Sequence, residues 1–157
     1  MELRRADRRD RELIVEMARL ACGFEDRPLP SPDDPEVLAL VPGAANVAVV
    51  ATEQGGKGLG AAWWHFHEPP LITDVQGRAV PEIAMAVRED ARANGIGGRL
   101  LEQLAVEATN EGFDALALNV HLRSPATRLY MRSGFRVTGK GRGWYGVAMV
   151  RALDQTG

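Results

Sequence analysis

Residues 87–101 read Val-Arg-Glu-Asp-Ala-Arg-Ala-Asn-Gly-Ile-Gly-Gly-Arg-Leu-Leu, and this stretch decides the fold. It follows a short apolar run, Ile83 to Val87, that predicts a buried strand. It leads into a helix whose apolar side chains recur at Ile96, Leu100, Leu101, Leu104 and Ala108. The loop and the helix start expose backbone N–H groups, and the three glycines let a ligand approach the main chain. The stretch therefore predicts a binding site for a pyrophosphate.

The spacing of the glycines limits which phosphate ligand fits. A dinucleotide-binding turn needs a third glycine where Leu100 stands and an acidic residue about twenty residues further on, and neither is present. The chain also lacks Gly-x-x-x-x-Gly-Lys-Ser/Thr, so a nucleoside triphosphate loop is not predicted. What matches is the pattern Arg/Gln-x-x-Gly-x-Gly/Ala, here Arg92-Ala93-Asn94-Gly95-Ile96-Gly97.

A second block follows in the chain. Phe113 to Val120 is typical of a buried strand, and Ser124-Pro125 then predicts a helix N-cap with proline at the first helical position. The pattern Ala-x-x-Leu-Tyr-x-x-x-Gly-Phe begins at Ala126. Its alanine, leucine and tyrosine share one helix face, and Gly134 is expected just past the helix end.

Together the two blocks resemble the GCN5-related N-acetyltransferase (GNAT) family. In that family the first block binds acetyl-coenzyme A (acetyl-CoA), and the second commonly reads Asn-x-x-Ala-x-x-Leu-Tyr-x-x-x-Gly-Phe. The resemblance implies an α/β (mixed α+β) acyl-CoA N-acyltransferase fold. Such a fold has a central, mostly antiparallel mixed sheet with splayed central strands, flanked by helices. Arg123 stands where the family usually has Asn, so the contact of that Asn is in doubt here.

The resemblance implies acetyl-CoA as co-substrate and no metal. The pantetheine arm is expected in a wedge between the strand that ends at Val87 and the strand that ends at Asn119. The cofactor-binding residues expected are Ala86, Val87, Arg92, Ala93, Asn94, Gly95, Ile96, Gly97, Gly98, Asn119, Ala126 and Tyr130.

The reaction implied is direct acetyl transfer to a primary amine. Because an alkyl amine has a pKa of about 10.4, roughly one molecule in a thousand is neutral at pH 7, so a proton acceptor is needed. Tyr130 is the expected general acid to the CoA thiolate, the simpler alternative being an aromatic packed against the sheet. Glu82, where the strand into the loop starts, is the candidate base, and the alternatives are water or a solvated glutamate.

Five further residues have structural alternatives. His65 and His67 share one strand face by period two, and we expect a pocket lining or a base from them, because no third zinc ligand accompanies them. Trp63 and Trp64 point to opposite faces, so one is expected in the core and the other at the wall of the acceptor pocket. Cys22 is expected as a half-buried thiol at a helix end and not as a nucleophile.

Length and composition predict one compact domain, which the resemblance implies is a single N-acetyltransferase domain over residues 1–157. A hydrophobic content of 45% and a charged content of 25% are ordinary for a globular chain of this length. The net charge is −2 and no basic run stands out beyond Arg4 to Arg11, so no nucleic-acid partner is expected. Asp7 and Asp10 within that cluster indicate a solvated helix start. With one cysteine and no targeting or membrane-length segment, we expect a cytoplasmic protein with no membrane partner.

Periodicity and turn signals predict the order β-α-α-β-β-β-α-β-α-β-β. Asp7 is a candidate cap of the first helix, and Asp33 or Asp34 opens the second with Pro35 in its first turn. The final strand, Trp144 to Arg151, is expected to present an edge through which two copies form a homodimer.

The acceptor is a small-molecule or protein amine that the sequence does not identify. Phe24 to Glu36 holds four prolines and five acidic residues, so it is either a rim that attracts a cationic amine or a solvated loop. A second function class, a non-catalytic acyl-CoA-binding or sensing module with the same fold, stays open. Tyr130 and the intact loop favour the enzyme, whereas Arg123 is a mild point for the module.

Overall fold

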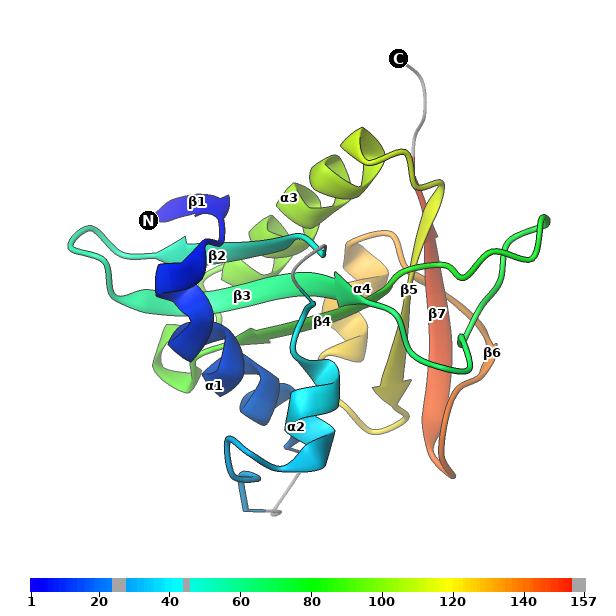
Figure 1. The fold of residues 1–157 in the computed structure, drawn as a ribbon, viewed down its shortest axis with the longest axis horizontal. Helices are drawn as coiled ribbons and strands as arrows, with labels where there is room; N and C mark the ends of the chain where they lie inside the picture. Colours follow the sequence, from blue (N-terminus) through cyan, green and yellow to red (C-terminus); the bar gives the residue numbers. More distant parts are fainter. Residues whose placement is uncertain (24–27, 44–45, 154–157) are drawn as a thin grey trace. The chain divides into compact units, whose positions relative to one another are not determined.

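A computed structural model describes residues 1–23, 28–43 and 46–153 (Figure 1). Seven strands form one mixed sheet in the order β1-β2-β3-β4-β5-β7-β6, flanked by helices. The strands are β1 (Glu2–Arg5), β2 (Ala48–Thr52), β3 (Gly58–His65), β4 (Glu82–Val87), β5 (Ala115–His121), β6 (Arg136–Lys140) and β7 (Gly146–Ala152). The helices are α1 (Arg11–Cys22), α2 (Pro35–Leu40), α3 (Ile96–Asn110) and α4 (Thr127–Arg132), with short 3-10 turns η1 (Arg8–Asp10) and η2 (Glu89–Ala91). The predicted element order and fold class are confirmed.

The chain forms two compact units. Unit 1 comprises Met1–His65 with Ala84–Leu104, and unit 2 comprises Phe66–Ile83 with Ala105–Gly157. Strand β4 and helix α3 each contribute residues to both units. No helix within the described ranges is long and apolar enough to cross a membrane.

In unit 1, both faces of the β2–β3 ladder are covered. The α1 face is filled by a cluster that includes Met17, Val37, Val50 and Trp63, and α1 passes in front of β3 in Figure 1. Residues of opposite parity face the α3 side, where a Cβ built on Gly60 would lie 3.2 Å from a Leu100 methyl carbon. Every residue of β2 is consequently buried.

The two covered faces correct the expectation for the adjacent tryptophans. Trp63 is 0% exposed and Trp64 is 2% exposed, so both are core residues. The Trp63 indole donates a 2.8 Å hydrogen bond from Nε1 to the Leu40 carbonyl, which satisfies its polar atom at the end of α2.

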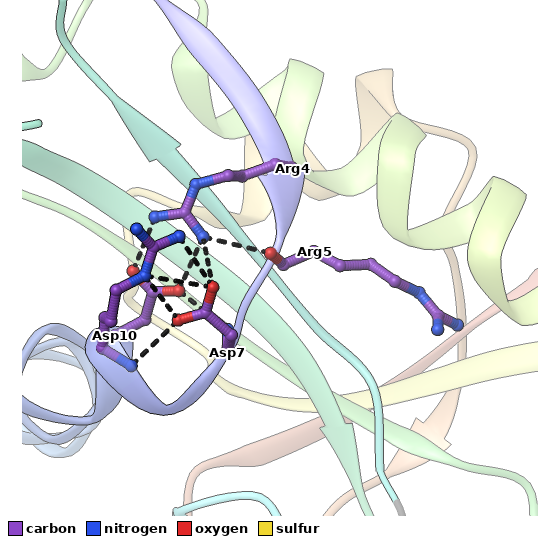
Figure 2. Close-up of polar contacts among 5 residues, drawn as sticks. Arg4, Arg5, Asp7 and Asp10 are labelled. Atoms are coloured by element: carbon purple, nitrogen blue, oxygen red, sulfur yellow. Dashed lines mark hydrogen bonds and ion pairs between the residues drawn. The ribbon is translucent and has the colours of Figure 1, made fainter.

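The N-terminal charge cluster is also more ordered than the sequence indicated (Figure 2). Arg4 on β1 contacts Asp10 through two hydrogen bonds of 2.7 and 2.9 Å, and the Asp7 backbone N–H donates to Asp10 at 2.8 Å. Asp7 in turn accepts from the Arg9 backbone, which completes a capping box around η1. Asp10 is buried, whereas Asp7, Arg8 and Arg9 are exposed, so the helix start is solvated as expected except at the Arg4–Asp10 pair.

The second helix begins as predicted. Asp34 caps α2 by accepting a 2.9 Å hydrogen bond from the Glu36 N–H, and Pro35 occupies its first turn. The proposed rim extends over residues 24–36, and its part at 24–27, with Glu25 and Asp26, lies outside the described residues.

In unit 2, β5 pairs with β7 along its whole length, from Ala115 with Ala152 to His121 with Gly146. Strand β4 pairs with β5 in parallel at one position, Glu82 with Ala117. Strand β7 also pairs with β6, so β7 is an inner strand. The exposed edge is β6, whose five residues are all exposed, and this corrects the expectation that the last strand forms the edge.

Candidate functional site

The first group of candidate residues lies in unit 1, where β4 ends at Val87. The chain there is anchored by Arg88, which donates from Nε to the Gly58 carbonyl at 2.7 Å and pairs with Glu16 at 2.5 Å. The Arg92 guanidinium donates to the Val87 carbonyl at 3.1 Å, and the Asn94 side chain donates to the Ala91 carbonyl at 3.2 Å. These side chains hold the loop in place by hydrogen bonds to its own backbone and to the end of β4.

The backbone of this loop adopts conformations that ordinary helices and strands do not use. Ala93 has φ of +68° and Gly95 has φ of +76°, both in the left-handed region. For alanine this conformation carries strain, which proteins concentrate at ligand sites. Residues 92–95 are exposed, and the 15-residue helix α3 starts directly after them. The exposed N–H groups and the helix dipole suit an anionic ligand.

The expected cofactor residues of the first block therefore lie together in unit 1. Ala86 and Val87 are buried at the end of β4, and Ile96 is buried at the start of α3. Gly97 and Gly98 are half-buried in the first turn of α3. A main chain of this geometry suits a pyrophosphate, and the role of these residues in cofactor binding stays a prediction.

The second group lies in unit 2, around α4. The helix begins at Thr127, two residues later than the sequence predicted. Residues 124–126 form a turn, in which the Ser124 hydroxyl accepts a 3.2 Å hydrogen bond from the Ala126 N–H. The first backbone hydrogen bond of this segment runs from the Thr127 N–H to the carbonyl of Ser124, three residues earlier, at 3.3 Å. Ser124 therefore caps a turn of the 3-10 type that precedes the helix.

The C-terminus of α4 is a Schellman motif. The Phe135 N–H donates to the Tyr130 carbonyl at 3.0 Å and the Gly134 N–H donates to the Met131 carbonyl at 3.1 Å. Gly134 has φ of +92°, which glycine adopts without a Cβ penalty, so its predicted place just past the helix is confirmed. The presence of glycine and phenylalanine in the second block is thus explained by the C-cap that they form.

Tyr130 is buried, with 8% of its surface exposed, and its ring packs edge-on against Phe135. Burial alone raises the pKa of Tyr130 to about 12, and no charged or hydrogen-bonding group of the described chain offsets it. One turn earlier, the buried Thr127 hydroxyl oxygen also has no hydrogen-bond partner within the described ranges. The Tyr130 phenol is therefore protonated and uncharged across the physiological pH range.

Glu82 begins β4, as predicted, but it is not a solvated glutamate. It is 2% exposed and lies in a two-point ion pair with Arg142 from the β6–β7 turn, at 2.5 and 2.7 Å. The Leu71 N–H also donates to it at 3.3 Å. This geometry holds an ionised carboxylate in one orientation.

The remaining second-block candidates are also in unit 2. Asn119 is exposed on β5, and its side-chain oxygen accepts a 2.7 Å hydrogen bond from the Arg142 N–H. Ala126 is half-buried in the turn before α4. Arg123, which replaces the usual Asn, is exposed, and its backbone N–H donates to His121 Nδ1 at 3.0 Å.

The histidine pair does not form as expected. Strand β3 ends at His65, which is buried, and His67 is exposed beyond the strand end, so period two no longer relates them. No group of three His, Cys, Asp or Glu residues in the described part of the chain could hold a metal ion. Cys22 ends α1 half-buried, and burial together with Glu36 and Asp34 raises its pKa to about 11, so it is a poor nucleophile.

Sequence reasoning missed Arg142. The segment from Gly139 to Gly143 has the composition of a flexible turn, and nothing in its pattern predicts a partner 60 residues away in the chain. The only available signal was a lone arginine between glycines.

Comparison with known proteins adds to this picture. Residues 44–137 match the family model described as an acetyltransferase (GNAT) domain. No curated protein sequence matches the chain. Among solved structures, a ribosomal-protein-alanine N-acetyltransferase from Brucella melitensis is 21% identical, with a TM-score of 0.71, over 98% of this chain and 100% of that one.

Two other solved structures share the fold. A phosphinothricin acetyltransferase of the GNAT superfamily from Sinorhizobium meliloti, in complex with acetyl-CoA, is 24% identical over 98% of this chain and 89% of that one, with a TM-score of 0.71. A GCN5-related N-acetyltransferase from Kribbella flavida is 24% identical over 97% of each chain, with a TM-score of 0.71. At these identities the likeness describes the fold.

Proposed function

The chain belongs to the GNAT acetyltransferase family, and from this premise we propose that it transfers the acetyl group of acetyl-CoA to a primary amine. The observation that carries the proposal is Tyr130, a buried phenol with a pKa of about 12 on a helix locked by its own C-cap. A module that only binds CoA has no need of a buried proton donor. The acetyl-CoA complex of the Sinorhizobium meliloti relative supports the choice of co-substrate.

Acetyl-CoA would be held mainly through the main chain. The backbone N–H groups of residues 93–95 and of the first turn of α3 would bind the pyrophosphate, with Gly97 and Gly98 allowing close approach. Because Arg92 donates to the Val87 carbonyl, its side chain shapes the loop and need not contact phosphate. Ala86, Val87, Asn119 and Ala126 are the proposed contacts of the pantetheine arm.

Tyr130 is the proposed acid toward sulfur. A free thiol has a pKa of about 8.5, so complete proton transfer from a phenol near 12 is uphill. The phenol would therefore donate a hydrogen bond to the sulfur as negative charge develops there. The sulfur leaves as a thiolate that accepts this hydrogen bond and then takes a proton from solvent, while the proton lost by the amine is returned to solvent, so protons and charge balance.

Glu82 is the proposed proton acceptor, acting directly or through a water. Its carboxylate is held ionised by Arg142, which supports this role. The attacking amine forms the C–N bond, the C–S bond breaks, and the amine proton leaves by way of this carboxylate or water.

The alternative is a non-catalytic acyl-CoA-binding module, and one experiment separates the two. Release of free thiol from acetyl-CoA would be measured with a panel of amines, alongside CoA affinity by calorimetry. The enzyme gives amine-dependent thiol release, whereas the module binds CoA and releases none.

A variant in the loop tests the proposed pyrophosphate-binding site itself. Gly97→Val should abolish CoA binding in a folded protein, because a side chain excludes phosphate from the main chain. Val106→Thr, an exposed position on the same helix, is the matched control and should bind normally. Unchanged affinity in folded Gly97→Val would remove the loop from the site.

We also propose a homodimer, formed through the exposed edge strand β6. Light scattering would test it over a range of concentrations. A constant mass near the 17.1 kDa of one chain would contradict it.

A further inference from the structure

The turn between β6 and β7 is built so that only glycine fits at both of its ends. A Cβ at Gly141 would overlap the side-chain oxygen of Asn119, and a Cβ at Gly146 would overlap the Arg142 carbonyl oxygen. The Gly141 N–H donates to the Gly146 carbonyl at 2.9 Å, which closes the turn. The turn therefore packs directly against β5 and delivers Arg142 to that strand.

Arg142 makes contacts with three separate segments of unit 2. Its guanidinium holds both Glu82 oxygens and also donates to the Pro69 carbonyl at 2.9 Å. Its backbone N–H donates to the Asn119 side-chain oxygen at 2.7 Å. The side chain of Glu82 is 3% exposed and that of Arg142 is 28% exposed, so the pair is largely removed from water.

We propose that Arg142 is a positioning residue for the acetyl transfer, which holds the Glu82 carboxylate ionised and in one orientation. The inference rests on the proposed function of Glu82 as proton acceptor. A buried carboxylate without a cation takes up a proton or moves toward water, and either change removes a base from the site. A planar guanidinium with two parallel bonds fixes orientation as well as charge, which a lysine ammonium does not.

The side-chain and backbone contacts of Arg142 can be separated by mutation. Arg142→Ala removes the contacts to Glu82 and Pro69 and leaves the N–H that holds Asn119. We expect kcat to fall by about tenfold to a hundredfold, the scale for a misplaced catalytic group, while KM for acetyl-CoA changes less than about twofold. Arg78→Ala, which removes an exposed arginine paired with Asp74 in the same unit, is the matched control and should retain wild-type kcat.

Two further measurements distinguish positioning from general destabilisation. Millimolar guanidinium should partly restore kcat to Arg142→Ala, because the free cation can occupy the vacated position. In a Glu82→Gln background, Arg142→Ala should lower kcat by less than about threefold, because the residue through which Arg142 acts is already lost. A full additional decrease in that background would overturn the inference.

The results that would overturn the role of Arg142 differ from those that would overturn the proposed acetyl transfer. A wild-type protein that acetylates none of the amines removes the proposed function itself. An active wild type with Arg142→Ala at the same kcat overturns the role of Arg142 alone. If thermal unfolding shows that Arg142→Ala does not fold, Arg142→Lys decides: a lower kcat at unchanged KM for acetyl-CoA supports positioning, and an unchanged kcat rejects it.

Discussion

Tyr130 and Phe135 are joined twice, by a 3.0 Å backbone hydrogen bond across the end of α4 and by an edge-on ring contact with centroids 5.9 Å apart. The backbone bond and the apolar contact are the two parts of a Schellman C-cap. Gly134, between them, supplies the left-handed residue that the cap requires. The helix that carries the proposed acid is thus fixed by its immediate neighbours in sequence.

This arrangement makes Tyr130→Phe a clean test of the acid. The substitution removes one oxygen and keeps the ring against Phe135, so the fold and CoA affinity should change little. We expect kcat to fall by roughly 10²-fold, the scale for losing one hydrogen bond to charge that develops in the transition state, with KM for the amine nearly constant. Steady-state kinetics at a pH where chemistry limits the rate would measure this. Near wild-type turnover would assign Tyr130 a packing role only.

The ionisation of Tyr130 gives a related expectation for pH. Because burial raises its pKa to about 12, the phenol stays protonated throughout the range in which the protein is assayed. Any loss of kcat between pH 8 and about 10 should therefore persist unchanged in shape in Tyr130→Phe. A basic limb that disappears in this variant would show that Tyr130 titrates in that range.

Gly60 on β3 should tolerate no side chain. A Cβ there would lie 2.8 Å from the Ala86 carbonyl oxygen, at the strand end that leads into the phosphate loop. Gly60→Ala should lower the free energy of unfolding by about 1–3 kcal/mol, the usual cost of overpacking. Gly58→Ala is the matched control, because its clash is with the end of the Leu13 side chain, which can rotate away, and not with backbone, so it should cost less. Denaturant unfolding of both variants would check the order, and equal losses would contradict it.

Asp10 should make stability depend on acid pH. Burial raises its pKa, but hydrogen bonds from Arg4 and the Asp7 N–H, with the Arg4 charge, outweigh this and lower it below 3.8. A depressed carboxyl pKa contributes stability that is present above the unfolded value and lost as pH falls through the folded value. Asp10→Asn should therefore lower the free energy of unfolding at pH 7 by about 1–3 kcal/mol, and the difference from wild type should shrink below about pH 4.

The control for Asp10 is a surface pair of the same charge type. Asp90 lies 3.4 Å from Lys57, and both side chains are mostly exposed. Asp90→Asn should change stability by less than about 1 kcal/mol at any pH. An Asp10→Asn variant that behaves like this control would show that the internal pair adds nothing.

Cys22 should react slowly. Burial, Glu36 and Asp34 raise its pKa from 9.0 to about 11, so its thiolate fraction near pH 8 falls about a hundredfold. Alkylation by iodoacetamide should be correspondingly slow in the folded protein and fast in denaturant. A rate in the folded protein equal to that in denaturant would contradict the buried environment.

The sequence by itself determined the features that depend on near neighbours in the chain. The loop at residues 92–97, the Asp34 cap with Pro35, and the Gly134 cap each form bonds within a few residues, so turn and cap chemistry predicts them. The element order also followed, because hydrophobic periodicity is a local property. The roles of Tyr130 and Glu82 remain predictions.

Tertiary structure alone decided which faces and edges are covered. Both tryptophans of β3 are buried because helices cover both faces of the ladder, and β6 is the edge because β7 pairs on both sides. His67 does not share a strand face with His65, because β3 ends at His65. The ion pair of Glu82 with Arg142 joins residues 60 apart, and the Arg4–Asp10 pair buries a carboxylate that looked solvated. These contacts depend on which distant segments of the chain pack together, and neither hydrophobic periodicity nor turn signals predict that packing.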